Sequence, residues 1–342
     1  MKKLLFSLSI MIFAVAFLTG CKQDPSSSSI MTMKAPPPAN AHPEIALTGT
    51  TTSKNTSYQT IAVMDSDGAN LTNVFTASTV NQSLHRPTWS GNGNEIVFFE
   101  TDLGSTTART TLKKFTVTVT NGVATGGTAT TLVTKSSTDN SIWTAEWSPS
   151  TTNSQIAYTT IASGGAHGST LYTVAGTGGA STLVTSSSDC NFTGITWNSG
   201  ASKIAIVCQY FTSPTSDTVS YYCIKIVNTS GVLQDSIGIA NYKGILANNI
   251  EWSRTGIDQL AYTTAVFTNG GTEFLSGTDS VLVQDASSAG TAAFAVAGQH
   301  ATWSPTNWKL AYNSATGIST VITASGTTAS ISTTGNMPNW KK

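Results

Sequence analysis

Charged side chains are scarce in this sequence. Asp, Glu, Lys and Arg make up 10% of the 342 residues, with 17 basic and 17 acidic side chains, whereas roughly a quarter is usual. A nucleic-acid-binding surface carries a basic patch, and none is visible along the chain, so we expect no nucleic-acid partner. Ser, Thr, Gly and Ala take the place of the charges, and β-branched Thr suits exposed strand positions.

Side chains that perform catalysis or bind metals are also few. The sequence has four histidines and four cysteines. It lacks a Gly-x-Ser-x-Gly nucleophile motif, a His-Glu-x-x-His metal motif and a phosphate-binding loop. We therefore expect no metal, no cofactor and no catalytic residue, and a non-enzymatic role is favoured over an enzymatic one.

Beyond its first twenty residues the chain shows no sustained 3.6-residue apolar period, so helices are not expected. Instead, a tryptophan recurs in a similar short phrase at intervals of 58, 50, 55, 51 and 37 residues, which indicates a repeat architecture. These structural repeat positions are Trp89, Trp147, Trp197, Trp252, Trp303 and Trp340.

Each repeat has the same internal order. A polar turn follows the tryptophan, and then a short apolar run such as Glu95–Phe99 or Lys309–Tyr312 is typical of a buried strand. Two more strands follow, and four short antiparallel strands form one propeller blade. The sequence therefore predicts an all-β fold, a β-propeller with six blades.

The partial repeats at the two ends of the propeller complement each other. The last repeat has only its first strand, Asn336–Trp340. The N-terminal stretch supplies the other three, which are Ile45–Thr48, Thr60–Asp65 and Leu71–Phe75. We expect these four strands to form the sixth blade, because closure removes exposed sheet edges.

The repeats resemble those of a known family. Trp147-Ser148-Pro149 is followed by a polar turn and Ile156-Ala157-Tyr158, and Asp65–Thr72 forms a further shared phrase. These motifs are similar to the WD-like repeats of TolB-type six-bladed β-propellers. The resemblance covers about residues 44–342 and implies the fold; it names no function.

The N-terminus has the features of an export signal. Lys2 and Lys3 precede the apolar run Leu4–Leu18, and Leu18–Cys21 resembles the lipobox of bacterial lipoproteins. We expect a signal peptide over residues 1–20, a lipidated Cys21 with palmitate-type acyl chains, a Ser/Pro-rich tether over 21–43 and the propeller over 44–342. An ordinary signal peptide or a membrane-spanning anchor is the alternative, although the run is short for a span.

A lipid anchor on Cys21 places the protein on a membrane of the cell envelope. Several acyl chains hold a protein there stably. Residue 22 is Lys where an Asp would resemble an inner-membrane retention signal. This favours the outer membrane, on its periplasmic or surface side, in a Gram-negative host.

Three cysteines lie within the predicted propeller, and a disulfide is allowed outside the cytoplasm. Cys208 ends the second strand of one blade and Cys223 begins the third, so a hairpin makes them face each other. Cys208–Cys223 is the first choice for a disulfide, and Cys190–Cys208 is the second.

The first strand of each blade lines the central channel, so the residues just before it surround one mouth. We define the channel mouth by the residues His85, Arg86, Asn140, Trp143, Asn191, Asn248, Asn249, His300 and Asn336. Aromatic and amide groups there can bind a peptide or a sugar by stacking and hydrogen bonding. The alternative is that these side chains cap turns.

Two acidic features could indicate other functions. Glu146 and Glu251 each precede a repeat tryptophan and could form a glycosidase carboxylate pair, but their blades are not adjacent and we expect them to be too far apart. Asp65–Asn70 resembles part of a calcium loop, yet the twelfth position is Thr76 instead of Glu. A turn is favoured there.

The sequence thus favours an envelope-anchored module that binds a protein or peptide, or acts as a scaffold, through the channel mouth. The alternative is a propeller that binds glycans or acts on them as a hydrolase or lyase. The fold alone does not decide between these two functions.

Overall fold

The computed structural model of the chain describes residues 43–104, 109–136, 140–162, 167–213, 216, 218–239, 243–254, 258–266, 278–287, 292–306, 309–323 and 325–341. Every regular element in these ranges is a β-strand. Over the same ranges, no helix has the length and apolar character needed to cross a membrane. The predicted signal peptide, Cys21 and nearly all of the predicted tether lie outside the described residues.

The strands form six antiparallel sheets, here called blades one to six. Blade one contains β4 (Gln82–Trp89), β5 (Glu95–Asp102), β6 (Arg109–Thr120), β7 (Val123–Gly126) and β8 (Thr130–Ser136). Blade two contains β9 (Ser141–Trp147), β10 (Gln155–Ile161), β11 (Ser169–Ala175) and β12 (Thr182–Ser187). Blade three contains β13 (Cys190–Trp197), β14 (Lys203–Phe211), β15 (Val219–Asn228) and β16 (Leu233–Gly238).

Blade four contains β17 (Lys243–Trp252), β18 (Gln259–Val266), β19 (Ser280–Asp285) and β20 (Ala292–Ala297). Blade five contains β21 (Gln299–Trp303), β22 (Lys309–Ser314), β23 (Gly317–Ile322) and β24 (Thr328–Ser332). Blade six joins the two ends of the propeller in the order β25 (Asn336–Trp340), β1 (Ile45–Ser53), β2 (Thr56–Met64) and β3 (Thr72–Thr76). Ile45 is paired with Trp340, which confirms the predicted closure.

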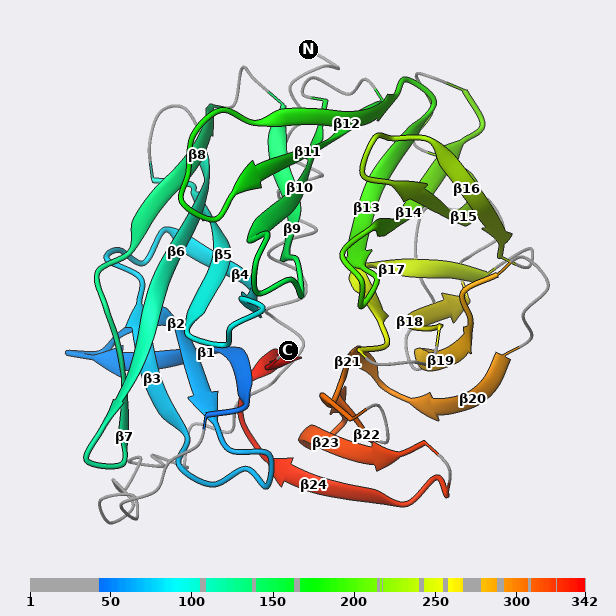
Figure 1. Cartoon of the computed structure of the whole chain (residues 1–342). Coiled ribbons are helices and arrows are strands. Elements are labelled where there is room, and N and C mark those ends of the chain that lie inside the picture. The colour runs from blue at the N-terminus through cyan, green and yellow to red at the C-terminus, as the bar shows by residue number, and fades with distance from the viewer. Residues whose placement is uncertain are drawn as a thin grey trace. The chain divides into compact units, whose positions relative to one another are not determined.

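The first strands of successive blades touch one another around the axis, in the cyclic order β4, β9, β13, β17, β21 and β25 (Figure 1). Hydrogen bonds join several pairs of first strands. In each pair, the side chain of the residue that precedes one repeat tryptophan accepts a hydrogen bond from the backbone N–H of a repeat tryptophan in another blade. The donor–acceptor distances are 3.2 Å for Trp147 to Thr88, 2.9 Å for Trp252 to Thr196, 3.0 Å for Trp340 to Thr302 and 3.2 Å for Trp89 to Asn339.

The hydrophobic core lies between the blades. All six repeat tryptophans are at most 3% exposed. Trp89, for example, packs in one cluster with Ile61 of blade six and Phe98 of its own blade. Each blade therefore buries apolar side chains on both faces, which is why its strands are continuous apolar runs instead of alternating ones.

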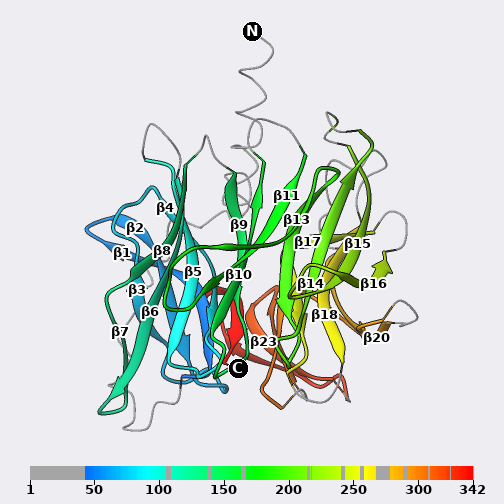
Figure 2. The ribbon, with the colours of Figure 1, turned by 45° about the horizontal axis from the view of Figure 1, so that its top comes forward.

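Blade one has an additional hairpin that the repeat pattern did not predict. β6 pairs with β8 along its first half and with β7 along its second half. Asn121 and Gly122, both with positive φ, make the tight turn between β6 and β7. Gly126 is needed where β7 meets β3, because a Cβ there would lie 1.9 Å from the Val74 carbonyl oxygen. Figure 2 shows this hairpin beside β3.

Candidate functional site

The first strands of blades one, five and six share an irregularity at the same place. Arg86, His300 and Met337 each stand three residues before a repeat tryptophan, and each has a left-handed backbone, with φ values of 36°, 52° and 51°. The pairing of β4, β21 and β25 with their neighbours shifts there, as at a β-bulge. Bulges re-aim side chains and are frequent next to functional sites.

Arg86 lies at the centre of a buried group of charges that we call the central ion network, together with Glu146, Glu251 and Arg254. The Arg86 Nη2 donates to the Ile250 carbonyl oxygen at 2.7 Å and lies 3.3 Å from Glu251 Oε2 and 3.9 Å from Glu146 Oε2. All four residues are at most 7% exposed. Two cations and two anions thus neutralise each other on the axis, as buried charges require.

The remaining contacts complete the network. Arg254 forms an ion pair with Glu251, and Thr196 Oγ1 donates to Glu146 Oε1 at 3.3 Å. Burial lowers the pKa of Arg254 to about 10. Burial also lowers the pKa of Arg86, and the negative charge of Glu146 partly offsets this effect by raising it. Both guanidinium groups stay protonated at neutral pH.

The two carboxylates are therefore close together. Because both are within 4 Å of one guanidinium nitrogen, their separation falls below the roughly 9.5 Å upper limit for a glycosidase pair. The expectation that they would be too far apart is wrong, since long side chains from blades two and four reach across the axis to Arg86. Sequence reasoning also missed Arg254 as their second partner.

A small cavity borders the network. A cavity of about 10 Å³ is lined by residues that include Arg86, Glu251, His300 and Met337, and about this volume is needed for one water molecule. The carboxylates are fully buried, so a sugar ring cannot reach them in this structure.

The other predicted mouth residues have varied surroundings. Trp143 is 40% exposed and is the extra residue at a bulge in β9, and Asn140 and Asn336 are exposed. His85 stacks on Phe99 with ring centroids 4.6 Å apart. Asn191, on β13, accepts a hydrogen bond at 3.1 Å from the N–H of Gly168, which directly precedes β11. The side chains of Asn248 and Asn249 lie outside the described residues.

We expect the protein to lose stability in acid through two histidines. Burial lowers the pKa of His85 to about 4, and burial together with the Arg86 charge lowers the pKa of His300 to about 3. Both values lie below the roughly 6.5 of an unfolded chain. The stabilisation is therefore complete above pH 6.5 and is lost as the pH falls through 4, because the unfolded chain binds protons that the folded chain does not.

The two rings are partly exposed, so we expect a loss of about 2 kcal/mol from pH 7 to pH 4 and not the full value of the shifts. Urea unfolding at a series of pH values measures it. His300→Asn is the matched variant, because Asn tolerates a left-handed backbone. A pH dependence that this variant leaves unchanged would rule out a contribution from His300.

The three described cysteines form a row across blade three. Cys208 is directly opposite Cys223 in the pairing of β14 with β15, as predicted. All three thiols are buried and free, so neither Cys208–Cys223 nor Cys190–Cys208 is a disulfide in the structure. A hydrogen bond with Cys208 lowers the pKa of Cys190 to about 7.

The Asp65–Asn70 segment is a turn between β2 and β3. Its side chains bond within the turn, with Asn70 Nδ2 donating to Asp65 Oδ2 at 2.6 Å and the Ala69 N–H donating to Asp67 Oδ1 at 2.9 Å. Across the described ranges, no group of three His, Cys, Asp or Glu side chains is arranged to hold a metal ion.

No protein-family model and no curated protein matches the chain. Several solved structures are similar to the chain. A protein described as TolB from Agrobacterium tumefaciens is 11% identical, with 87% of this chain and 91% of that chain covered and a TM-score of 0.50. This likeness shows the fold, and it agrees with the TolB-type resemblance of the repeats.

Two further propellers are similar to the chain. The periplasmic gluconolactonase from Pseudomonas aeruginosa is 9% identical, with 87% of this chain and 98% of that chain covered and a TM-score of 0.48. The β-propeller domain of the trilobed protease from Pyrococcus furiosus is 10% identical, with coverage of 86% and 98% and a TM-score of 0.45. By its six blades and its likeness to the TolB structure, the chain is a TolB-like six-bladed β-propeller.

Proposed function

We propose that the chain is an envelope lipoprotein whose propeller binds a protein or peptide at the channel mouth without catalysing a reaction. The observation that carries this proposal is the central ion network. Its two buried carboxylates are committed to Arg86 and Arg254. A general acid or base must reach the proton that it transfers, and a buried, paired carboxylate does not.

The exposed part of the mouth suits recognition. Trp143 offers an indole that is 40% exposed, and Asn140 and Asn336 offer exposed amides. Large aromatic side chains dominate binding energy at interfaces, and amides supply hydrogen bonds that do not depend on charge. A partner with apolar or aromatic side chains and a free backbone matches this surface.

Crosslinking and pulldown from native membranes test the mouth. We expect Trp143→Ala to reduce capture of the crosslinked partner at least tenfold, because such an anchor contributes about 2 kcal/mol or more. Leu183→Ala is the matched control, since Leu183 is 58% exposed on the outer strand of blade two. Equal capture by both variants would refute binding at the mouth.

One observation favours the glycan-active alternative, namely the proximity of Glu146 to Glu251. That function requires the buried carboxylates to become accessible and Arg86 to release one of them. Release of reducing ends from envelope polysaccharides, abolished by Glu146→Gln in a folded variant, would establish it and overturn the non-enzymatic proposal.

The lipid anchor is tested separately. Labelling cells with radioactive palmitate should mark the protein and should fail to mark the Cys21→Ala variant. Labelling that survives this substitution would exclude Cys21 as the anchor.

A further inference from the structure

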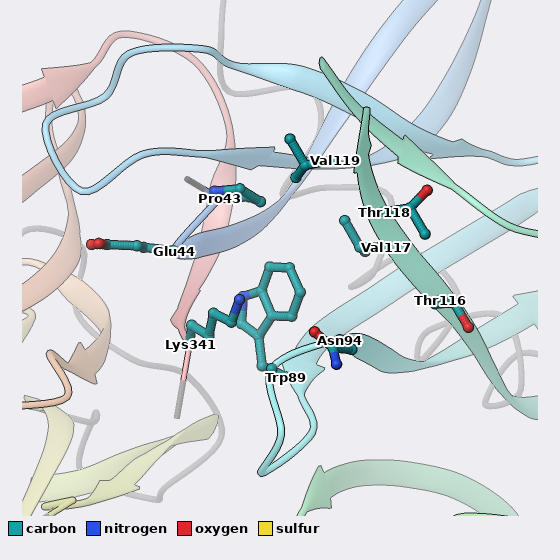
Figure 3. Close-up of a pocket in the computed structure, with 10 residues that line it drawn as sticks. Pro43, Glu44, Trp89, Asn94, Thr116, Val117, Thr118, Val119 and Lys341 are labelled. Atoms are coloured by element: carbon teal, nitrogen blue, oxygen red, sulfur yellow. The ribbon is translucent and has the colours of Figure 1, made fainter. Parts of the chain in front are cut away.

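A second and larger cavity, of about 780 Å³, opens where blade six meets blade one (Figure 3). We call it the seam pocket and define it by Pro43, Glu44, Trp89, Val117, Val119 and Lys341, which are among its lining residues. Its volume falls in the roughly 300–1,000 Å³ range of small-molecule sites. None of the channel-mouth residues lines it, so the seam pocket is separate from the channel mouth.

One wall of the seam pocket is apolar. Val117 and Val119 come from β6, in the half that pairs with β7, and Pro43 faces them across the opening (Figure 3). Val119 is 44% exposed. The repeat pattern does not require this hairpin, so the wall is an addition to the propeller and not a consequence of its closure.

The floor of the seam pocket carries a cation. The Lys341 Nζ lies 5.3 Å from the centre of the Trp89 ring, and within the described ranges it has no ion pair. Burial lowers the pKa of Lys341, while the charge of Glu44 opposes this effect. Gly93 makes room for the side chain, because a Cβ there would lie 2.0 Å from Lys341 Cε.

Trp89 supplies a second donor. Trp147 and Trp252 donate their indole N–H to Ser154 and Asp258, each at 2.7 Å. Asn94 occupies the corresponding place in blade one, yet the buried Trp89 Nε1 has no acceptor among the described residues. An unsatisfied buried donor costs about 1–3 kcal/mol. The indoles of Trp303 and Trp340 share this deficit, but of the three only Trp89 lines the seam pocket.

We propose that the seam pocket binds a small carboxylate with an apolar body. The carboxylate accepts hydrogen bonds from Lys341 and from the Trp89 indole, and the apolar body packs on Val117, Val119 and Pro43. A charge-assisted hydrogen bond is stronger than a neutral one, so the charge on the ligand is the main determinant of affinity. An amino acid with a blocked amine and a short fatty acid both have this chemistry.

Isothermal titration of the full chain with N-acetylphenylalanine, octanoate and N-acetylphenylalanine amide tests the proposal. We expect saturable binding of one or both carboxylates, and at least tenfold weaker binding of the amide. Which carboxylate binds more tightly distinguishes a peptide-like ligand from a fatty acid. The perturbation of a single indole N–H resonance in an NMR spectrum should accompany binding.

Lys341→Met should weaken carboxylate binding at least tenfold, and Lys54→Met is its control because Lys54 is exposed in the turn between β1 and β2. Val119→Asp should weaken carboxylate binding as well, because it places a negative charge on the apolar wall. This substitution leaves Lys341 and Trp89 unchanged. Absence of binding to either carboxylate, equal affinity for the amide, or unchanged affinity in Lys341→Met would each overturn the proposal. None of these outcomes bears on the channel mouth, where Trp143 is tested independently.

Discussion

Replacing Arg86 with Met should lower the free energy of unfolding by about 3–5 kcal/mol, the range for removing one partner of a buried ion pair. The substitution leaves Glu146 and Glu251 buried with only Arg254 to compensate them. Met is a suitable replacement because Met337 occupies the equivalent place in blade six, with the same left-handed backbone. Urea unfolding followed by circular dichroism measures the change.

A double-mutant cycle separates charge from packing. Glu146→Gln in the Arg86→Met background removes the excess negative charge and keeps the Glu251–Arg254 pair, so we expect it to recover part of the lost stability. A loss below about 1 kcal/mol for Arg86→Met would mean that water compensates the carboxylates and that the axis is more open than the structure shows.

Trp147→Ala should destabilise the protein by about 3–5 kcal/mol, as large-to-small substitutions of buried aromatic residues do. Trp147 is fully buried between blades one and two, in a cluster with Val97 and Leu112. It also donates to Ser154 Oγ at 2.7 Å, so truncation removes a hydrogen bond as well as a packed ring.

The same strand supplies the control for this substitution. Trp143 lies four residues earlier on β9 and is 40% exposed, so Trp143→Ala should change stability by no more than about 0.5 kcal/mol. Similar losses for the two variants would contradict the assignment of one tryptophan to the core and the other to the surface. Thermal unfolding of both variants in parallel is sufficient to compare them.

The sequence predicts most of the fold because a propeller repeats one pattern. The recurring tryptophans and the apolar run after each of them define the blades, and the two partial repeats predict that Trp340 belongs with Ile45, as it does. The β6–β7 hairpin was not predicted. Its strand Val123–Gly126 is short and lies within a segment that reads as a connection between two strands.

The candidate site was predicted less well, and the reason is geometric. A bulge changes which side of a strand a residue faces, and nothing about Arg86, His300 or Met337 alone reveals a left-handed backbone. The signal was present in the comparison of repeats, since Arg86-Pro87-Thr88-Trp89 and Met337-Pro338-Asn339-Trp340 have the same form. The meeting of Glu146 with Glu251 depends on side chains crossing the axis, which repeat spacing does not encode.

The pairing of β25 with β1 also sets an order of events during synthesis. The strand that completes blade six is made after the other described strands of the propeller, and Thr48 donates to the Asn336 carbonyl oxygen across 288 positions of sequence. Joining such distant segments carries an entropy cost that grows slowly with loop length. Until β25 has been made, the propeller is an open array with two unpaired edges, so its exposure to aggregation and proteases ends only when blade six closes.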